Sequence, residues 1–191
     1  PLDLAADKHD HVDLVLARTL LRFTDPRRFG LILWQPGPPQ AALAHPLLAH
    51  LGVEPLTEAF TAAWLQEALA RRHSPIKPVL MDSHLLVGVG NIYASESLFR
   101  AGISPLRAAN RIAATRIDRL TTAIKETLSE AIAAGGSSIR DYVHSDGSPG
   151  WFQIQAGVYE RAGQPCRRCS GTVRQIRQTG RSTYYCPACQ R

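Results

Sequence analysis

The pattern of apolar and polar positions changes along the chain and predicts strands first, helices next and strands again at the end. Apolar and polar residues alternate over residues 11–16, and the apolar runs 20–24 and 31–34 follow, so three strands are predicted. Three strands alone make a poor independent domain, which indicates the end of a larger sheet. The Pro/Gly-rich residues 35–40 are typical of a linker or long loop.

Helical spacing begins at Thr57, which can cap the N-terminus of a first helix. Four helical segments are predicted: from Thr57 to Ser74-Pro75, and over residues 76–81, 92–100 and 115–134. Thr115 and Asp118 resemble a capping box for the last and longest helix. Gly135 and Gly136 are expected to end it.

Composition and charge narrow the classes of protein. The chain has 191 residues, of which 45% are hydrophobic and 20% charged, which is typical of a globular protein and excludes disorder. The apolar runs are too short for a membrane span. The net charge is +6, and residues 161–191 contain seven arginines and no aspartate or glutamate. This basic C-terminal segment indicates a polyanionic partner, with a solvated surface as the alternative.

The four cysteines all lie in this basic segment, as Cys166-x2-Cys169 and Cys186-x2-Cys189 with sixteen residues between the pairs. This spacing is typical of a zinc ribbon, in which two knuckles complete a tetrahedral site. The intervening residues predict two strands, 172–176 and 181–185, joined by a turn at 178–180 that leaves Arg181 near its tip. Two disulfides and a rubredoxin-like iron site are the alternatives; no export signal is visible, which disfavours disulfides. A closed four-cysteine site is structural, because no position is left for water.

Two loops carry candidate binding chemistry. Adjacent arginines and a phenylalanine in the segment 25–30 suit a nucleic-acid wedge, although a hairpin with solvated arginines and a core phenylalanine has the same sequence. The segment 88–91 forms a tight turn that opens a helix, and its free amides and the Asn91 side chain suit a phosphate. An ordinary corner between helices is the alternative for this segment.

Several motifs follow one another along the chain. They are His9–Asp13, Thr24–Gly30, Ile76-Lys77, Gly88–Glu96, Ser145-Asp146-Gly147 and the four-cysteine ribbon. Over essentially its whole length the chain resembles bacterial formamidopyrimidine-DNA glycosylase, and the wording of Gly90–Glu96 is closer to this family than to its sister, endonuclease VIII. The resemblance implies an α+β fold: the last strands of an N-terminal β-sandwich (residues 1–40), a helix–two-turns–helix domain (41–150) and a zinc ribbon (151–191).

The resemblance also implies roles for matching residues. Arg27 would fill the space left by the flipped base, and Phe29 would wedge beside it. Arg181 would clamp a phosphate near the lesion and assist the late elimination step. Residues 136–147 resemble the loop that closes over the flipped base. Contacts to the DNA backbone or near the lesion are implied for His9, Arg28, Arg72, Lys77 and Asn91.

The implied activity is that of a DNA glycosylase and AP lyase of base-excision repair, which removes oxidised purines (8-oxoguanine, formamidopyrimidines) from duplex DNA with β,δ-elimination. The expected protein is a cytoplasmic, nucleoid-associated monomer that carries one structural zinc ion, binds double-stranded DNA with an oxidised purine or abasic site, and has no membrane partner.

The chain departs from the family at its start. The family's nucleophile is an N-terminal proline followed by glutamate, whereas Pro1 is followed by Leu2. A fragment that lacks the N-terminal catalytic part is therefore expected, which binds DNA without excising the base. Lys77 is not expected to replace the nucleophile, because a surface ammonium has a pKa of about 10.4. The alternatives are a non-catalytic zinc-dependent DNA-binding module, an endonuclease VIII-like glycosylase, and a zinc-stabilised interaction protein without a DNA role.

Overall fold

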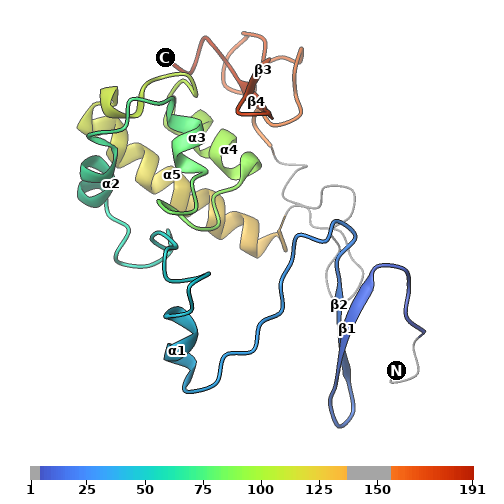
Figure 1. Ribbon diagram of the computed structural model, residues 1–191. Helices are drawn as coiled ribbons and strands as arrows, with labels where there is room; N and C mark the ends of the chain where they lie inside the picture. The colour runs from blue at the N-terminus through green and yellow to red at the C-terminus, as the bar shows by residue number, and fades with distance from the viewer. Residues whose placement is uncertain (1–4, 137–155) are drawn as a thin grey trace. The chain divides into compact units, whose positions relative to one another are not determined.

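The computed structural model describes residues 5–136 and 156–191 (Figure 1). The chain divides into two compact units, Pro1–His45 and Pro46–Arg191, each of which has its own internal packing. Pro1, the motif Ser145–Gly147 and all of the expected closing loop except Gly136 lie outside the described residues.

From residue 5 onward, the first unit contains one antiparallel hairpin and one short helix. Strands β1 (Asp10–Val15) and β2 (Leu20–Thr24) pair with a register shift between Asp10 and Val12. The third strand predicted over residues 31–34 is wrong: this segment is extended without ladder partners among the described residues, and its apolar side chains are exposed. A strand is stabilised by the ladder and by burial of one face, and this segment has neither. Helix α1 (Pro39–Leu43) begins inside the predicted linker, with a proline in its first turn.

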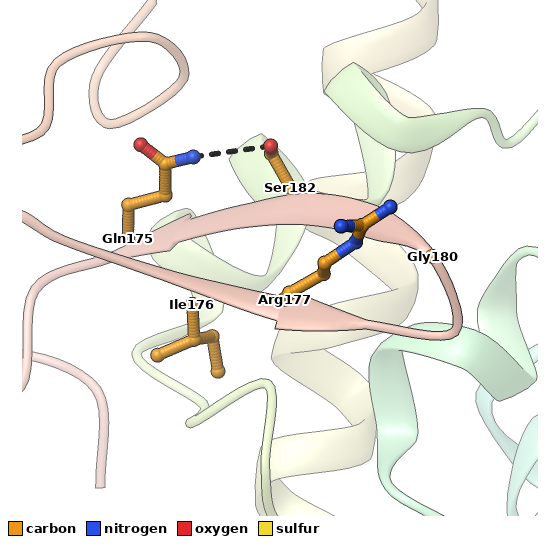
Figure 2. A pocket seen from close by; sticks show the side chains of 5 residues that line it. All are labelled: Gln175, Ile176, Arg177, Gly180 and Ser182. Atoms are coloured by element: carbon orange, nitrogen blue, oxygen red, sulfur yellow. Dashed lines mark hydrogen bonds between the residues drawn. The ribbon is translucent and has the colours of Figure 1, made fainter.

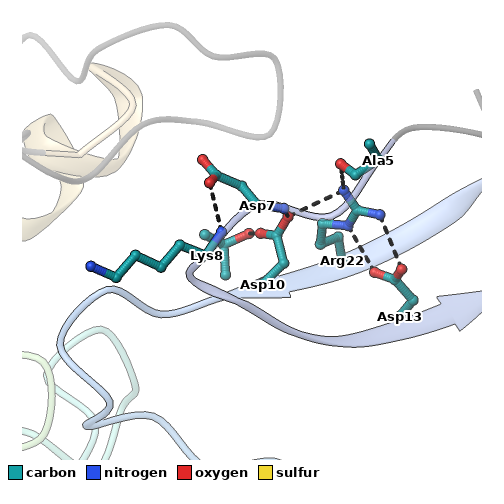
Figure 3. A network of polar contacts seen from close by, with 7 residues as sticks. Ala5, Asp7, Lys8, Asp10, Asp13 and Arg22 are labelled. Atoms are coloured by element: carbon teal, nitrogen blue, oxygen red, sulfur yellow. Dashed lines mark hydrogen bonds and ion pairs between the residues drawn. The ribbon is translucent and has the colours of Figure 1, made fainter.

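A polar network holds the two strands of this hairpin together (Figure 3). Arg22 on β2 faces Asp13 on β1 and donates from Nε and Nη2 to its two carboxylate oxygens over 2.8 and 3.0 Å. Its Nη1 donates to the Ala5 carbonyl and to Asp10. The Arg22 hydrogen bond lowers the pKa of Asp13. Planar two-point pairing of this kind fixes the strand register through side chains as well as through the backbone.

Among the described residues of the second unit, four helices form its body: α2 (Ala62–Leu69), α3 (Ile76–Leu80), α4 (Asn91–Ala101) and α5 (Ala114–Ala133), and a 3-10 turn lies at Ala109–Arg111. The helix pattern of the sequence is thereby confirmed. The large buried side chains include Phe60, Leu65, Leu80, Leu98, Leu120 and Ile124. None of the helices in the described residues is long and apolar enough to cross a membrane.

The helix boundaries correct two of the predicted caps. The N-cap of α2 is Thr61, whose hydroxyl accepts the Trp64 amide, while the Thr57 hydroxyl donates to the Glu54 carbonyl in the turn before it. Helix α5 begins after Ala113 without a side-chain cap, so Thr115 lies within the helix and the predicted capping box does not form. Both errors come from threonines that suit a cap in isolation but lie away from the point where the apolar face begins to pack.

The end of α5 follows the prediction. Gly135 and Gly136 have φ of 74° and 84°, and the Gly136 amide donates to the Ala131 carbonyl over 2.6 Å. A left-handed residue with this hydrogen bond is a common helix terminator that glycine adopts without steric strain.

The ribbon follows as strands β3 (Arg174–Gln178) and β4 (Arg181–Tyr185). The first strand lies two residues later than predicted. Thr179 and Gly180 form the two-residue turn, with φ of 45° and 79°. Positive φ at both positions matches the type I′ turn, which fits the twist of a hairpin. Arg181 is therefore the first residue of β4 and stands beside the turn.

Candidate nucleic-acid interface and metal centre

The four cysteines converge on one point. Their Sγ atoms all lie within 4.8 Å of one another, with separations of 3.3 Å for Cys169–Cys189, 3.6 Å for Cys169–Cys186 and 3.8 Å for Cys166–Cys189. A tetrahedral zinc site with Zn–S bonds of about 2.3 Å has sulfurs about 3.8 Å apart, whereas a disulfide needs about 2.05 Å. The thiols are free and their arrangement fits one structural zinc ion, so the zinc prediction is confirmed and the disulfide alternative is excluded.

The surroundings of the sulfurs favour a bound cation. Burial would raise the pKa of Cys166, but the amides of Arg168 and Cys169 point at its sulfur and lower that pKa to about 7. Burial beside the other sulfurs raises the pKa of Cys189 to about 12. Four close thiolates repel one another, and a divalent cation removes that repulsion. Gly171 leaves room for the cluster, since a Cβ there would lie 3.3 Å from the Cys169 sulfur.

Side chains that the sequence reasoning overlooked fasten the zinc knuckles to the C-terminal end of α4. Arg168 donates to the carbonyls of Phe99 and Arg100 over 2.8 and 3.1 Å, and its guanidinium lies 5.4 Å from the centre of the Phe99 ring. Buried Gln190 accepts the Cys186 amide over 2.8 Å and donates to the Ile103 carbonyl over 2.9 Å. The sequence shows Arg168 only as one positive charge among several.

Glu96, in the middle of α4, is a further residue whose role the sequence analysis did not identify. It is 2% exposed, and its carboxylate accepts the amides of Gly157, Val158 and Tyr159 over 2.8, 3.0 and 2.8 Å. A Cβ at Gly157 would lie 2.6 Å from the Phe99 ring, so only glycine permits this approach. An acidic residue between the apolar positions of a helix is the one signal in the sequence that could have identified this docking point.

Lys77 is placed differently from the expectation. The prediction of a surface ammonium is wrong: Lys77 is 1% exposed, because α3 packs against α4 and lies beside β4. Its Nζ donates to Asn91 Oδ1 over 2.5 Å, to Thr183 Oγ1 over 2.8 Å and to the Ser182 carbonyl over 3.3 Å. Burial and the nearby Arg181 charge lower the pKa of Lys77 to about 8.

Asn91 is the first residue of α4, and Gly90 before it supplies no side-chain cap. The Asn91 Nδ2 donates to the Tyr159 hydroxyl over 3.3 Å, and the Tyr159 ring meets Tyr184 edge to face. A helix N-terminus carries unpaired amides and the positive end of the helix dipole. The structure thus brings Lys77, Asn91 and the start of β4, where Arg181 is exposed, to one place.

The outer face of the hairpin adds a polar pocket of about 480 Å³. In Figure 2, Gln175, Arg177 and Ser182 rise from one face of the two strands and Ile176 points from the other, as the two-residue period requires. The Gln175 amide donates to the Ser182 hydroxyl over 3.1 Å. The pocket therefore has a basic, hydrogen-bonding wall beside the turn.

Arg72, another predicted contact, forms an ion pair with Asp82 over 3.0 Å, and the other oxygen of Asp82 lies 3.1 Å from His84 Nδ1. The Arg72 side chain is 37% exposed, so part of the guanidinium faces solvent. In the first unit, the carbonyl of His9, also a predicted contact, accepts the Asp25 amide, which joins its strand end to the loop 25–30.

The loop 25–30 is organised by Asp25. Its carboxylate accepts the amides of Arg27, Arg28 and Gly30 over 3.1, 3.0 and 2.6 Å, and these bonds, with Gly30 foremost, lower the pKa of Asp25. Arg28 is left-handed with φ of 55°. The Phe29 side chain is 81% exposed and lies 5.5 Å from the Arg27 guanidinium. The alternative of a core phenylalanine is therefore wrong, as is the expectation that the loop joins two strands.

The second unit joins a helical domain to a four-cysteine ribbon, and the hairpin of this ribbon carries exposed arginines. These features define the class: a zinc-ribbon protein with a cationic surface. Two family models match: "Formamidopyrimidine-DNA glycosylase H2TH domain" over residues 51–143 and "Zinc finger found in FPG and IleRS" over residues 163–191.

Two curated relatives share one name. The chain is 73% identical over 190 residues to formamidopyrimidine-DNA glycosylase of Dechloromonas aromatica (strain RCB). The matched region covers 100% of this chain and 69% of the relative. The chain is 53% identical over 192 residues to that of Bordetella pertussis (strain Tohama I), covering 100% of this chain and 70% of the relative.

Solved structures agree. MutM (Fpg) from Thermus thermophilus is 41% identical, with a TM-score of 0.84 over 98% of this chain and 70% of that one. Lactococcus lactis Fpg in complex with abasic-site DNA is 36% identical, with a TM-score of 0.87 over 100% of this chain and 69% of that one. The chain belongs to the formamidopyrimidine-DNA glycosylase family.

Proposed function

We propose that this chain provides the DNA-binding and lesion-recognising surface of a base-excision repair glycosylase and AP lyase that acts on oxidised purines in duplex DNA. The observation that carries the proposal is the meeting of the α4 N-terminus with the start of β4. Asn91 supplies a neutral N–H donor there, the helix supplies its positive end, and exposed Arg181 supplies a charge. Together these groups suit the phosphates next to a damaged nucleotide.

The loop 25–30 suits a second task, which is to occupy the stack when a base is turned out. An exposed aromatic ring beside a guanidinium can enter between base steps, and the Asp25 bonds to backbone amides fix the loop that carries both side chains. Base extrusion is needed because a glycosidic bond cannot be attacked inside the duplex. In this proposal Arg27 and Phe29 recognise the distortion, and Arg28 and His9 bind the backbone.

The remaining assignments follow the family. Arg72 and Lys77 belong to the DNA-binding half, and Arg181 also assists the elimination step. The zinc ion holds the hairpin and takes no part in the chemistry, because its four positions are filled by sulfur. Residues 1–40, 41–150 and 151–191 are assigned to the sandwich strands, the helix–two-turns–helix domain and the ribbon. Action on chromosomal DNA would place the protein at the nucleoid.

The test compares two duplexes, one intact and one with an abasic site, by fluorescence anisotropy at several salt concentrations. Arg28→Ala should weaken binding to both and lower the slope of log affinity against log salt by about 0.9. Phe29→Ala should mainly reduce the preference for the abasic duplex. Trp34→Ala is the matched control, since this aromatic side chain in the same unit is 89% exposed and lies outside the loop.

Equal losses on the two duplexes for Arg28→Ala and Phe29→Ala would contradict the division of roles. Binding without salt dependence would instead favour an interaction protein that has no DNA role. Competition with duplexes that contain an oxidised pyrimidine distinguishes the endonuclease VIII-like alternative, which predicts that they compete better than 8-oxoguanine duplexes.

A further inference from the structure

Lys77 has no donor left for a ligand. An ammonium group has three N–H bonds. The three acceptors around Lys77 Nζ are Asn91 Oδ1, Thr183 Oγ1 and the Ser182 carbonyl, and the side chain is 1% exposed. A phosphate oxygen could reach this nitrogen only if one of these bonds broke.

The bond to Asn91 decides which way its carboxamide faces. Because Oδ1 accepts from Lys77, the two N–H bonds of Nδ2 point away from it, and one of them reaches the Tyr159 hydroxyl. The reversed amide would place N–H donors against an ammonium, which is unfavourable. Lys77 therefore presents Asn91 as a donor, and a donor is what an anionic ligand requires.

The other two bonds act on the hairpin. Ser182 and Thr183 directly follow Arg181 along β4, and Thr183 is fully buried. The two bonds join positions more than a hundred residues apart in the chain. The Lys77 ammonium thus connects the N-terminus of α4 to the part of β4 that follows Arg181.

Among the residues that the structure describes, no carboxylate forms an ion pair with Lys77. A buried charge without a counter-ion is unfavourable, and neutral side chains could join the same elements at lower cost. The positive charge of Lys77 suits a site that binds an anion nearby, while the three N–H donors of Lys77 stay bonded to protein acceptors.

We propose that Lys77 is a positioning residue: it makes no contact with DNA, and it fixes the orientation of the Asn91 carboxamide and the path of β4 at Arg181. The inference rests on the proposed function, because it takes Asn91 and Arg181 as the groups that bind phosphate. It replaces the expected direct contact of Lys77 near the lesion.

The test is a double-mutant cycle on the zinc-loaded chain with an abasic-site duplex at pH 7. Asn91→Ala and Lys77→Met should each weaken binding about ten-fold or more, the loss typical of one hydrogen bond to a charged group. The double variant should be no more than about three-fold weaker than Lys77→Met, since residues that act through one another are not additive. Lys77→Arg should not restore affinity, because it keeps the charge but not the point geometry.

Lys125→Met is the matched control. Lys125 lies on α5 with its ammonium 5.9 Å from the Phe60 ring, away from the cluster, and its loss should leave affinity for the abasic duplex nearly unchanged. Zinc content and the urea midpoint establish that each variant is folded. Independently of DNA, the contact between the Asn91 side-chain amide and the Tyr159 ring should be visible by NMR in the parent chain and lost in Lys77→Met.

Different results would contradict the positioning role of Lys77 and the proposed phosphate site. Additive losses or rescue by Lys77→Arg would show a direct phosphate contact and overturn the inference. An unchanged NMR contact in Lys77→Met would overturn it as well. If Asn91→Ala and Arg181→Ala leave affinity unchanged, the phosphate site of the proposed function fails, and the inference fails with it.

Discussion

Glu96 offers a sharp test of how the ribbon is attached. Its Oε1 accepts the amides of Val158 and Tyr159, and its Oε2 accepts that of Gly157. In Glu96→Gln, the amide oxygen can keep the first two bonds, but the new NH2 group faces the Gly157 amide, donor against donor. One part-buried amide is then unsatisfied, which costs about 1–3 kcal/mol. In Glu96→Ala all three amides lose their acceptor, and the two buried ones alone cost about 2–6 kcal/mol.

The assay is urea unfolding of the zinc-loaded chain, followed by circular dichroism and by zinc release. Glu126→Gln on the exposed face of α5 is the control, and it should change the free energy of unfolding by less than about 0.5 kcal/mol. The expected order of stability is the control, then Glu96→Gln, then Glu96→Ala. If Glu96→Gln were as stable as Glu126→Gln, the three amides would not depend on this carboxylate and the docking argument would be wrong.

Three further outcomes are expected. Cys186→Ser should lose zinc and DNA affinity together, as measured by metal analysis and anisotropy, whereas unchanged DNA binding by a metal-free preparation would contradict the structural role of zinc. Arg168→Ala should lower the free energy of unfolding by about 1–3 kcal/mol, unlike Arg174→Ala on exposed β3, because it removes the charged hydrogen bonds to two carbonyls and the cation–π contact with the Phe99 ring. The pKa of Lys77 is about 8 in the folded chain against an ordinary 10.5, so the unfolded chain binds more protons between these values and the free energy of unfolding rises with pH there. Lys77→Met should remove that rise, and equal pH profiles for the two chains in urea unfolding would contradict it.

The sequence predicted those features that depend on interactions between residues close together in the chain. The period of apolar residues located α2 to α5, and the spacing of the cysteines located the metal site, since two knuckles of this length can close a tetrahedron without help from the rest of the fold. The end of α5 at Gly135 follows from backbone freedom alone.

What failed depends on contacts distant in sequence. Thr57 and Thr61 are both good caps, and only the packing of α2 selects Thr61. The burial of Lys77 depends on Thr183, more than a hundred residues away in the chain. The residues around Lys77 in the sequence give no sign of this burial. The segment 31–34 has the composition of a strand, but composition does not supply a partner for its backbone.

Helix α4 is the element to which the ribbon is attached. Along its length the ribbon and the segment before it are attached at three levels: Asn91 and Lys77 at the N-terminus, Glu96 in the middle, and Phe99, which receives Arg168, near the C-terminus. Eleven residues of helix span about 16 Å, so these attachments fix direction as well as position. Arg181 is thereby held from both ends of β4, by the Lys77 bonds beside it and by the zinc knuckle that begins at Cys186. A ligand-bearing hairpin held this way loses its geometry when either end is released, which is why removal of zinc and removal of the Lys77 ammonium should both weaken DNA binding without touching a DNA contact.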